Sequence, residues 1–340
     1  MQLRGRQGRP LFFAARHDKV CEWVDCAKRR IIRHPDMMST MKPPQSTAAI
    51  AMIVLAAMMF SIMDAGTKYL GGFLSVVLVL WSRYAIQAGI MAVWIGRTTG
   101  LRGFRTAHPR FQFLRGAMLI TLSVLTFYSL RHMPLAEFTA IIMLWPVLLT
   151  AVSGWFLDEP MSRLRWALVW GGFIGTLIVI RPGSGLFGTA VVLPLIAMVV
   201  STNYNLLTGR LARLENPHTT QFYTGITGAL LLTPLLATQA DTLLGMLHEL
   251  TSAHVSLLAI IGLLGTFGHL LLVMAFSRAP AAALMPFTYA QIIFAAAMSW
   301  LAFEHTPDLW AWIGMAMIAA CSSVSAWMHV RRPESARQAL

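Results

Sequence analysis

The chain has 340 residues, of which 56% are hydrophobic and only 12% are charged. A soluble protein carries roughly 25% charged residues, and so few charges cannot cover a water-facing surface. The composition therefore argues against a soluble globular enzyme and against disorder of the bulk of the chain. It favours a membrane protein that crosses the bilayer several times.

The net charge of +13 would favour nucleic-acid binding in a soluble protein. Here the basic residues lie in the tails and in short loops between apolar runs, which is the pattern that sets membrane topology. We therefore expect the lipid bilayer, and no nucleic acid, as a partner. The three cysteines, Cys21, Cys26 and Cys321, have no companion ligands at metal spacing, so the sequence predicts no disulfide framework, no metal site and no cofactor.

Residues 1–46 differ from the rest of the chain, since they hold ten of the 27 Lys and Arg residues. They contain no apolar run long enough for the central region of a signal peptide. We interpret them either as a disordered cytoplasmic arm or as sequence upstream of a true initiator at Met37, Met38 or Met41. In both cases they stand outside the predicted fold.

From Thr47 onward, apolar runs alternate with short breaks, and each run approaches the 20 or so residues that a spanning helix needs. The sequence therefore predicts an all-α integral membrane protein with about ten transmembrane helices, followed by a short tail at 331–340. The predicted spans are 47–66, 73–96, 112–131, 135–157, 165–180, 188–208, 218–238, 254–276, 281–303 and 309–329.

The charges in the loops predict an orientation. If the N-terminus is cytoplasmic, the loops on that side hold the arginines at 97–110, 163–165 and 210–213. The loops at 239–253 and 304–308, on the other side, hold no Lys or Arg. Because cytoplasmic loops are enriched in these residues, we expect a multi-pass protein of the cell inner membrane with both termini in the cytoplasm.

Two stretches of the chain resemble each other, residues 128–166 and 274–310. Each has a helix end, a proline shortly after an arginine, a helix that contains a second proline, and an acidic residue followed by a tryptophan. Pro134 of the first stretch corresponds to Pro280 of the second. The repeat predicts two halves of five helices, and because five is odd the second half enters the membrane from the opposite side, as in many secondary transporters.

These motifs resemble those of the EamA family of the drug/metabolite transporter superfamily, and the resemblance covers residues 47–329. It implies two EamA repeats, at 47–183 and 184–330, around a central cavity. The family carries amino acids, vitamins, nucleotide-like compounds and drugs, so it does not define one substrate. The segments that carry the resemblance are 127–137 (FYSLRHMPLAE), 157–160 (LDEP), 181–183 (RPG), 279–282 (APAA), 286–291 (PFTYAQ) and 303–307 (FEHTP).

Ionisable side chains inside spans are the first functional candidates, because each costs about 2.5–3.5 kcal/mol at a helix centre. Arg83 is the only arginine that the sequence places centrally in a span. It cannot lose its proton and could bind an anionic group of a substrate, with Tyr84 and Gln87 completing a polar site. The alternative is a structural ion pair with Asp64 or Glu137.

Three further charged residues are candidates for coupling or gating. Asp64 and Lys68 lie four residues apart and share a helix face, and the alternative is a local ion pair between them. Glu137 lies one turn into the fourth helix, where it could carry a coupling proton or simply stabilise the helix N-terminus.

Polar and aromatic residues inside the spans complete the candidate substrate site, with hydrogen bonding between helices as the alternative. Pro146 and Pro286 lie among them and free backbone carbonyls, which is tolerated at membrane depth beside a cavity. These candidates are Trp145, Asn203, Tyr204, His269, Tyr289 and Gln291.

The sequence thus predicts a secondary transporter that moves a small organic metabolite by alternating access. The cargo would be vitamin-like, nucleotide-like or amino-acid-like, with a polar or anionic group and a flat apolar part. One alternative is a broad exporter of amino acids or toxic compounds. Another is a membrane-embedded enzyme, but only isolated polar groups and no catalytic constellation are recognised. Proton coupling and the oligomeric state are left open.

Overall fold

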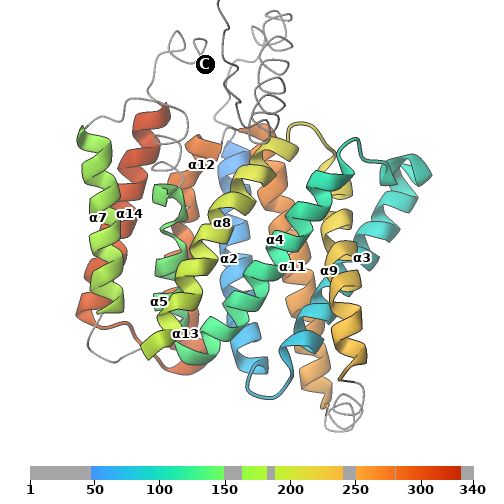
Figure 1. Cartoon of the computed structure of the whole chain (residues 1–340), viewed down its shortest axis with the longest axis horizontal. Coiled ribbons are helices and arrows are strands. Elements are labelled where there is room, and N and C mark those ends of the chain that lie inside the picture. The colour runs from blue at the N-terminus through green and yellow to red at the C-terminus, as the bar shows by residue number, and fades with distance from the viewer. Residues whose placement is uncertain (1–46, 149–162, 182–187, 240–249, 280, 331–340) are drawn as a thin grey trace, which may run out of the picture. The chain divides into compact units, whose positions relative to one another are not determined.

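The computed structural model of the chain describes residues 47–148, 163–181, 188–239, 250–279 and 281–330 (Figure 1). Within these ranges the protein is helical and contains no β-strand. The arm at 1–46, the tail at 331–340 and the acidic motif at 157–160 lie outside the described residues.

Each predicted span overlaps at least one helix, and the elements follow one another with short connections. They are α2 (Thr47–Leu70), α3 (Val76–Thr98), the 3-10 helix η3 (Gly100–Phe104), α4 (Pro109–His132), α5 (Leu135–Ile142), α7 (Arg163–Ile180), η4 (Gly188–Val191), α8 (Val192–Leu211), α9 (Pro217–Ala237), α11 (Ser252–Arg278), α12 (Ala281–Thr288), α13 (Ala290–Phe303) and α14 (Leu309–Val330).

Six stretches of the described residues are long and apolar enough to cross a membrane, which agrees with a multi-pass membrane protein. Three shorter apolar helices accompany them, at Leu135–Leu148, Trp166–Ile180 and Leu309–Cys321. The six stretches are Thr47–Leu70, Val76–Thr98, Pro109–His132, Gly188–Leu211, Ser252–Arg278 and Leu284–Phe303.

Several helices begin at residues that satisfy or remove the free N–H groups of the first turn. Ser75, Asn216 and Thr251 accept hydrogen bonds from backbone N–H groups in the first turns of α3, α9 and α11. Pro109 and Pro217 stand at the starts of α4 and α9, where the missing N–H has no consequence.

Two helices are interrupted near their prolines, as the sequence predicts. A turn at Met143–Leu144 follows α5, just before Pro146. Tyr289 separates α12 from α13, three residues after Pro286. Proline has no N–H to donate within a helix, so these breaks leave backbone groups at the depth of the central cavity described below.

Helix pairs approach closely through glycines. A methyl group added at Gly228 of α9 would lie 2.3 Å from Cγ of Tyr84 on α3. One added at Gly314 of α14 would lie 2.6 Å from the carbonyl oxygen of Gly175 on α7. Small residues are typical of such contacts in membrane proteins, because lipid supplies no hydrophobic drive for helix association.

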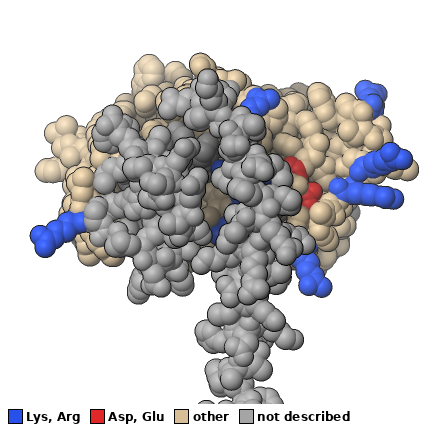
Figure 2. Space-filling model, turned by 90° about the horizontal axis from the view of Figure 1, so that it is seen from above, with Lys and Arg blue, Asp and Glu red and all other residues tan. Residues whose placement is uncertain are grey.

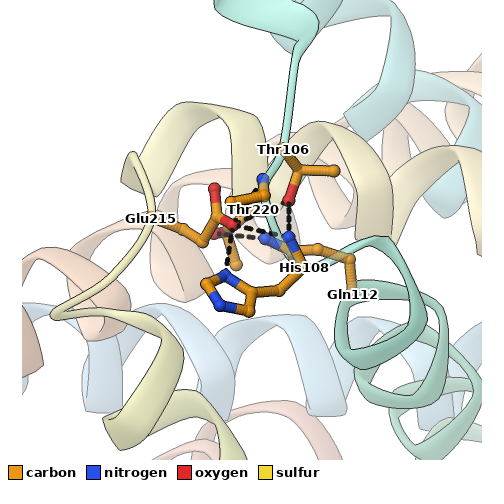
Figure 3. Close-up of polar contacts among 6 residues, drawn as sticks. Thr106, His108, Gln112, Glu215 and Thr220 are labelled. Atoms are coloured by element: carbon orange, nitrogen blue, oxygen red, sulfur yellow. Dashed lines mark hydrogen bonds and ion pairs between the residues drawn. The ribbon is translucent and has the colours of Figure 1, made fainter. Parts of the chain in front are cut away.

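The end of the molecule that carries the α3–α4 and α8–α9 connections is called the basic end here. The carboxylate of Glu215 joins these two connections (Figure 3). Oε1 of Glu215 accepts hydrogen bonds from Thr106 Oγ1 at 2.8 Å, from the Ala107 and His108 N–H groups at 3.0 Å each, and from His108 Nδ1 at 2.9 Å. Partial burial raises the pKa of Glu215, but the hydrogen bonds, led by that from His108, outweigh it and hold the pKa below its ordinary value of 4.5.

We expect Glu215→Gln to lower the free energy of unfolding by about 1–2 kcal/mol, because an amide oxygen forms weaker hydrogen bonds than a carboxylate. A depressed pKa contributes stability above the ordinary pKa and loses it as the pH falls. The difference in melting temperature between wild type and variant should therefore persist from pH 8 to pH 5 and shrink below pH 4.5. Glu304→Gln, at an exposed carboxylate, is the control; an equal effect there would contradict this role of Glu215.

Candidate functional site

A central cavity of about 130 Å³, partly open to the surroundings, lies among α2, α3, α4, α5, α8, α11, α12 and α13. Like most ligand sites in proteins, it has mostly apolar walls and a few polar groups. The polar residues of this wall are Asp64, Thr67, Arg83, Ser123, Thr126, Thr139, Ser201, Tyr204, Asn205, His269, Thr288 and Gln291.

Arg83 is the central cation of this wall and is only 5% exposed. Its guanidinium donates to Ser123 Oγ at 3.2 Å and to His269 Nε2 at 3.0 Å. Its Nε is buried without a hydrogen-bond partner. No carboxylate of the described residues lies within 4.0 Å of it, so no ion pair among these residues occupies the guanidinium.

The hydrogen bond from Arg83 fixes the protonation of His269. A guanidinium can only donate, so Nε2 of His269 accepts, and Nδ1 carries the proton that it donates to the Tyr204 hydroxyl at 3.3 Å. The ring of Phe60 lies against the imidazole, with 4.6 Å between ring centroids. Residues of α2, α3, α8 and α11 are thereby held in one arrangement on the cavity wall.

Arg115 of α4 is a second buried arginine, which the sequence interpretation missed. It is fully buried and donates to Thr208 Oγ1 at 2.9 Å, to Tyr204 Oη at 2.8 Å and to Thr224. Its guanidinium lies 4.9 Å from the centre of the Tyr204 ring. The predicted span began at 112, whereas α4 begins at Pro109, so Arg115 lies in the second turn of the helix. Arg83 is therefore not the only buried arginine among the described helices, although Arg115 lies nearer a helix end.

The three acidic and basic candidates for coupling separate into different places. Asp64 lines the cavity, is 7% exposed, and has no described Lys, Arg or His within 4.0 Å. Lys68 instead donates to the carbonyl oxygens of Leu130 and, at 2.8 Å, of Met133. The alternative of an Asp64–Lys68 pair is therefore wrong, because the long lysine side chain reaches the end of α4.

Glu137 is buried but does not line the cavity. Its Oε1 lies 3.0 Å from His305 Nε2 at the end of the molecule opposite the basic end. The predicted alternative of a pair with Arg83 is wrong as well. Nearby, Arg181 and Asp308 form an ion pair at 2.6 Å. The pKa of Asp308 is lowered, first by the N–H of Ala311 and then, against a small effect of burial, by Arg181.

The remaining candidates divide between the cavity and other places. Trp145, Tyr204, His269 and Gln291 line it, whereas Tyr84 and Gln87 lie behind its wall. Tyr84 reaches it only through its 2.8 Å hydrogen bond with Ser123, and Gln87 donates to Gln221 of α9 at 2.9 Å. Asn203 is exposed and donates to its own helix, and Tyr289 is buried in the apolar core.

Residues such as Ser123, Ser201 and Thr139 line the cavity and were missed by the sequence interpretation. Ser201 and Asn205 are four residues apart on α8, on one face. Small hydroxyl groups are common in membrane helices, so their type alone carries no signal. Some of them could have been predicted from their helical spacing relative to a residue that was recognised, such as Tyr204.

Apolar helices with a partly open, polar cavity at their centre define a class of protein, the helical membrane transporter. Within this class, residues 188–326 match the EamA-like transporter family.

Curated relatives match along most of the chain. It is 27% identical to a riboflavin transporter of Brucella anthropi, over 79% of this chain and 95% of that protein. It is 26% identical to an S-adenosylmethionine uptake transporter of Rickettsia bellii, over 76% and 86%. It is 25% identical to the pseudopaline exporter CntI of Pseudomonas aeruginosa, over 82% and 96%.

A crystal structure shares the fold, with a TM-score of 0.59 and 18% identity, over 84% of this chain and 98% of that chain. The helical fold of the described residues has therefore been seen experimentally.

Proposed function

We propose that this protein is a secondary transporter that moves a small organic metabolite across the inner membrane by alternating access. The proposal rests above all on Arg83, a permanent cation that faces the central cavity and has no carboxylate of the described residues beside it. A charge at membrane depth without an ion pair is costly, and an anionic or strongly polar group of the cargo would offset that cost. The names of the relatives favour a transporter over a membrane-embedded enzyme.

The cargo also carries a flat ring. Phe60, Phe138, Trp145 and Tyr204 line the cavity with aromatic surface, on which a planar ring can stack. Riboflavin and S-adenosylmethionine, named for two relatives, both contain a flat heteroaromatic ring. These features favour a vitamin-like or nucleotide-like metabolite over a broad range of amino acids or toxic compounds.

The proposed architecture has ten transmembrane helices in two inverted repeats, at 47–183 and 184–330. The pattern of helix contacts supports it. If α8 corresponds to α2 and α11 to α4, the contact between α2 and α11 maps onto that between α8 and α4. On the same scheme α3 contacts its own counterpart α9, and α7 contacts its counterpart α14. A two-fold relation between the halves predicts these pairings.

The proposed orientation has both termini and the basic end in the cytoplasm. Ala107→Cys and Ser252→Cys, each in a chain with Cys21, Cys26 and Cys321 replaced by serine, test it at two exposed positions. An impermeant thiol reagent with access to the periplasm should label the cysteine at 252 and spare that at 107. The reverse labelling would overturn the orientation.

Purified protein in proteoliposomes tests the proposed function. We expect saturable flux of at least one of riboflavin, flavin mononucleotide and S-adenosylmethionine, above that of empty liposomes. Weak flux of many unrelated amino acids or dyes would favour a broad exporter instead. Absence of flux for every compound in both directions, from protein with an unchanged melting temperature, would contradict the assigned cargo class.

A further inference from the structure

A second cavity lies at the basic end and is not needed for the central site. It has a volume of about 220 Å³ and is lined by residues of α8, α11, α12 and the segments that follow α5 and α8. Trp145 and Asn205 line both this cavity and the central one. The second cavity, called the vestibule here, therefore adjoins the central cavity on the side of the basic end.

Two arginines distinguish the vestibule. Arg210 lies in the last turn of α8 and Arg213 three residues later, and both line the cavity. Both side chains are exposed, and no carboxylate of the described residues lies within 4.0 Å of either. The nearest acid in sequence, Glu215, directs Oε1 to the loop at 106–108.

Topology accounts for arginines on this side of the protein but not for their place in a cavity. Arg97, Arg102, Arg105 and Arg110 also lie at the basic end, and none of them lines either cavity. Figure 2 looks onto this end, where blue side chains project around the described surface. A cation at the C-terminus of α8 also interacts favourably with the helix dipole. One arginine would be enough for that interaction, so the helix dipole does not explain the second.

We infer that the vestibule is a second binding site, which takes the phosphate or carboxylate group of an organic anion on its way to or from the central cavity. Two guanidinium groups suit such oxygen-rich anions, because each can donate two parallel hydrogen bonds. Trp145, at the junction of the two cavities, offers a surface for a planar ring attached to that anionic group. The inference rests on the proposed transport function for its biological use, but binding can be measured without transport.

Inorganic pyrophosphate is the binding probe, and calorimetry on the full chain in a neutral detergent is the measurement. We expect Arg210→Gln/Arg213→Gln to weaken binding at least tenfold. Arg102→Gln/Arg105→Gln, which removes the same charge from the same end outside the cavity, should leave binding unchanged. Equal binding by both double variants would overturn the inference, even if transport were intact.

Flux and lipid experiments then identify the source of the anion. Arg210→Lys/Arg213→Lys keeps the charge that sets topology but loses the planar fork. In proteoliposomes it should raise KM for flavin mononucleotide at least fivefold and change kcat little. The KM for riboflavin, which has the same ring without phosphate, should not change.

If pyrophosphate binds in phosphatidylcholine nanodiscs but is displaced in phosphatidylglycerol nanodiscs, a lipid headgroup fills the vestibule, and the assignment to cargo is wrong. If pyrophosphate binds but no compound is transported, the vestibule stands and the proposed function fails.

Discussion

An Arg83→Gln protein is expected to reach the membrane in normal amount and to lose transport of an anionic substrate. The variant removes the cavity's central cation while the neighbouring Ser123 and Tyr84 keep their mutual hydrogen bond of 2.8 Å. A hydrogen bond to a charged group contributes about 1.5–3 kcal/mol, so substrate affinity should fall roughly 10- to 100-fold. Glutamine can still donate to His269, which limits the structural damage.

The lysine variant separates charge from geometry. Arg83→Lys keeps the positive charge but cannot hold Ser123 and His269 together with one planar group, so transport should be weakened only in part. Arg97→Gln, on an exposed position of the same helix, is the control. Membrane abundance and initial transport rate are measured for all three. Near-normal transport by well-expressed Arg83→Gln would show that this residue does not bind cargo, and degradation of that protein would favour a structural role.

The helical fold was predictable because the signal is simple. Apolar runs of spanning length are separated by charged or proline-containing breaks, and each predicted run overlaps a helix. The ends of helices were less certain. The start of α4 at Pro109 instead of 112 places Arg115 in the buried part of the helix. Because of this small difference, the sequence interpretation recognised Arg83 but missed Arg115, the other arginine beside Tyr204 and His269.

The direction in which a polar side chain points was not predictable in the same way. In a soluble helix the polar face marks the solvent, but in a membrane helix the lipid-facing and protein-facing sides are both apolar. Asn203, Tyr204 and Asn205 are consecutive in α8, yet the first is exposed on the outside and the other two line the cavity. The partner of Lys68 was not predictable for a related reason. Its long side chain reaches carbonyl groups that are distant in sequence, such as that of Met133.

Side-chain contacts between helices that are distant in sequence are the second feature that local sequence patterns do not predict. Glu215 joins the loop at 106–108 to the α8–α9 connection at the basic end. At the opposite end, His305 reaches Glu137 and Asp308 reaches Arg181. These contacts join helices at both ends of the protein, and the vestibule lies beside the first of them. Access from the basic end would involve the arginine pair, and access from the opposite end would require these two contacts to separate.

An Asp64→Asn protein is expected to lose transport driven by a proton gradient while it still exchanges substrate across the membrane. Asp64 lines the central cavity with 7% exposure and has no described cation within 4.0 Å. A buried carboxylate without an ion pair is costly, and a bound proton or a positive group of the cargo would offset that cost. Asparagine mimics the protonated side chain and cannot release the proton.

Proteoliposomes with an imposed pH gradient measure this effect. If one proton accompanies each neutral cargo molecule, wild-type protein can concentrate the cargo about tenfold for each pH unit. Asp64→Asn should reach only the external concentration, yet exchange labelled for unlabelled substrate at a rate near that of wild type. Glu304→Gln, which removes an exposed carboxylate that lines neither cavity, should still concentrate substrate. Gradient-driven accumulation by Asp64→Asn would assign the coupling proton to another group, and loss of exchange together with accumulation would assign Asp64 to cargo binding.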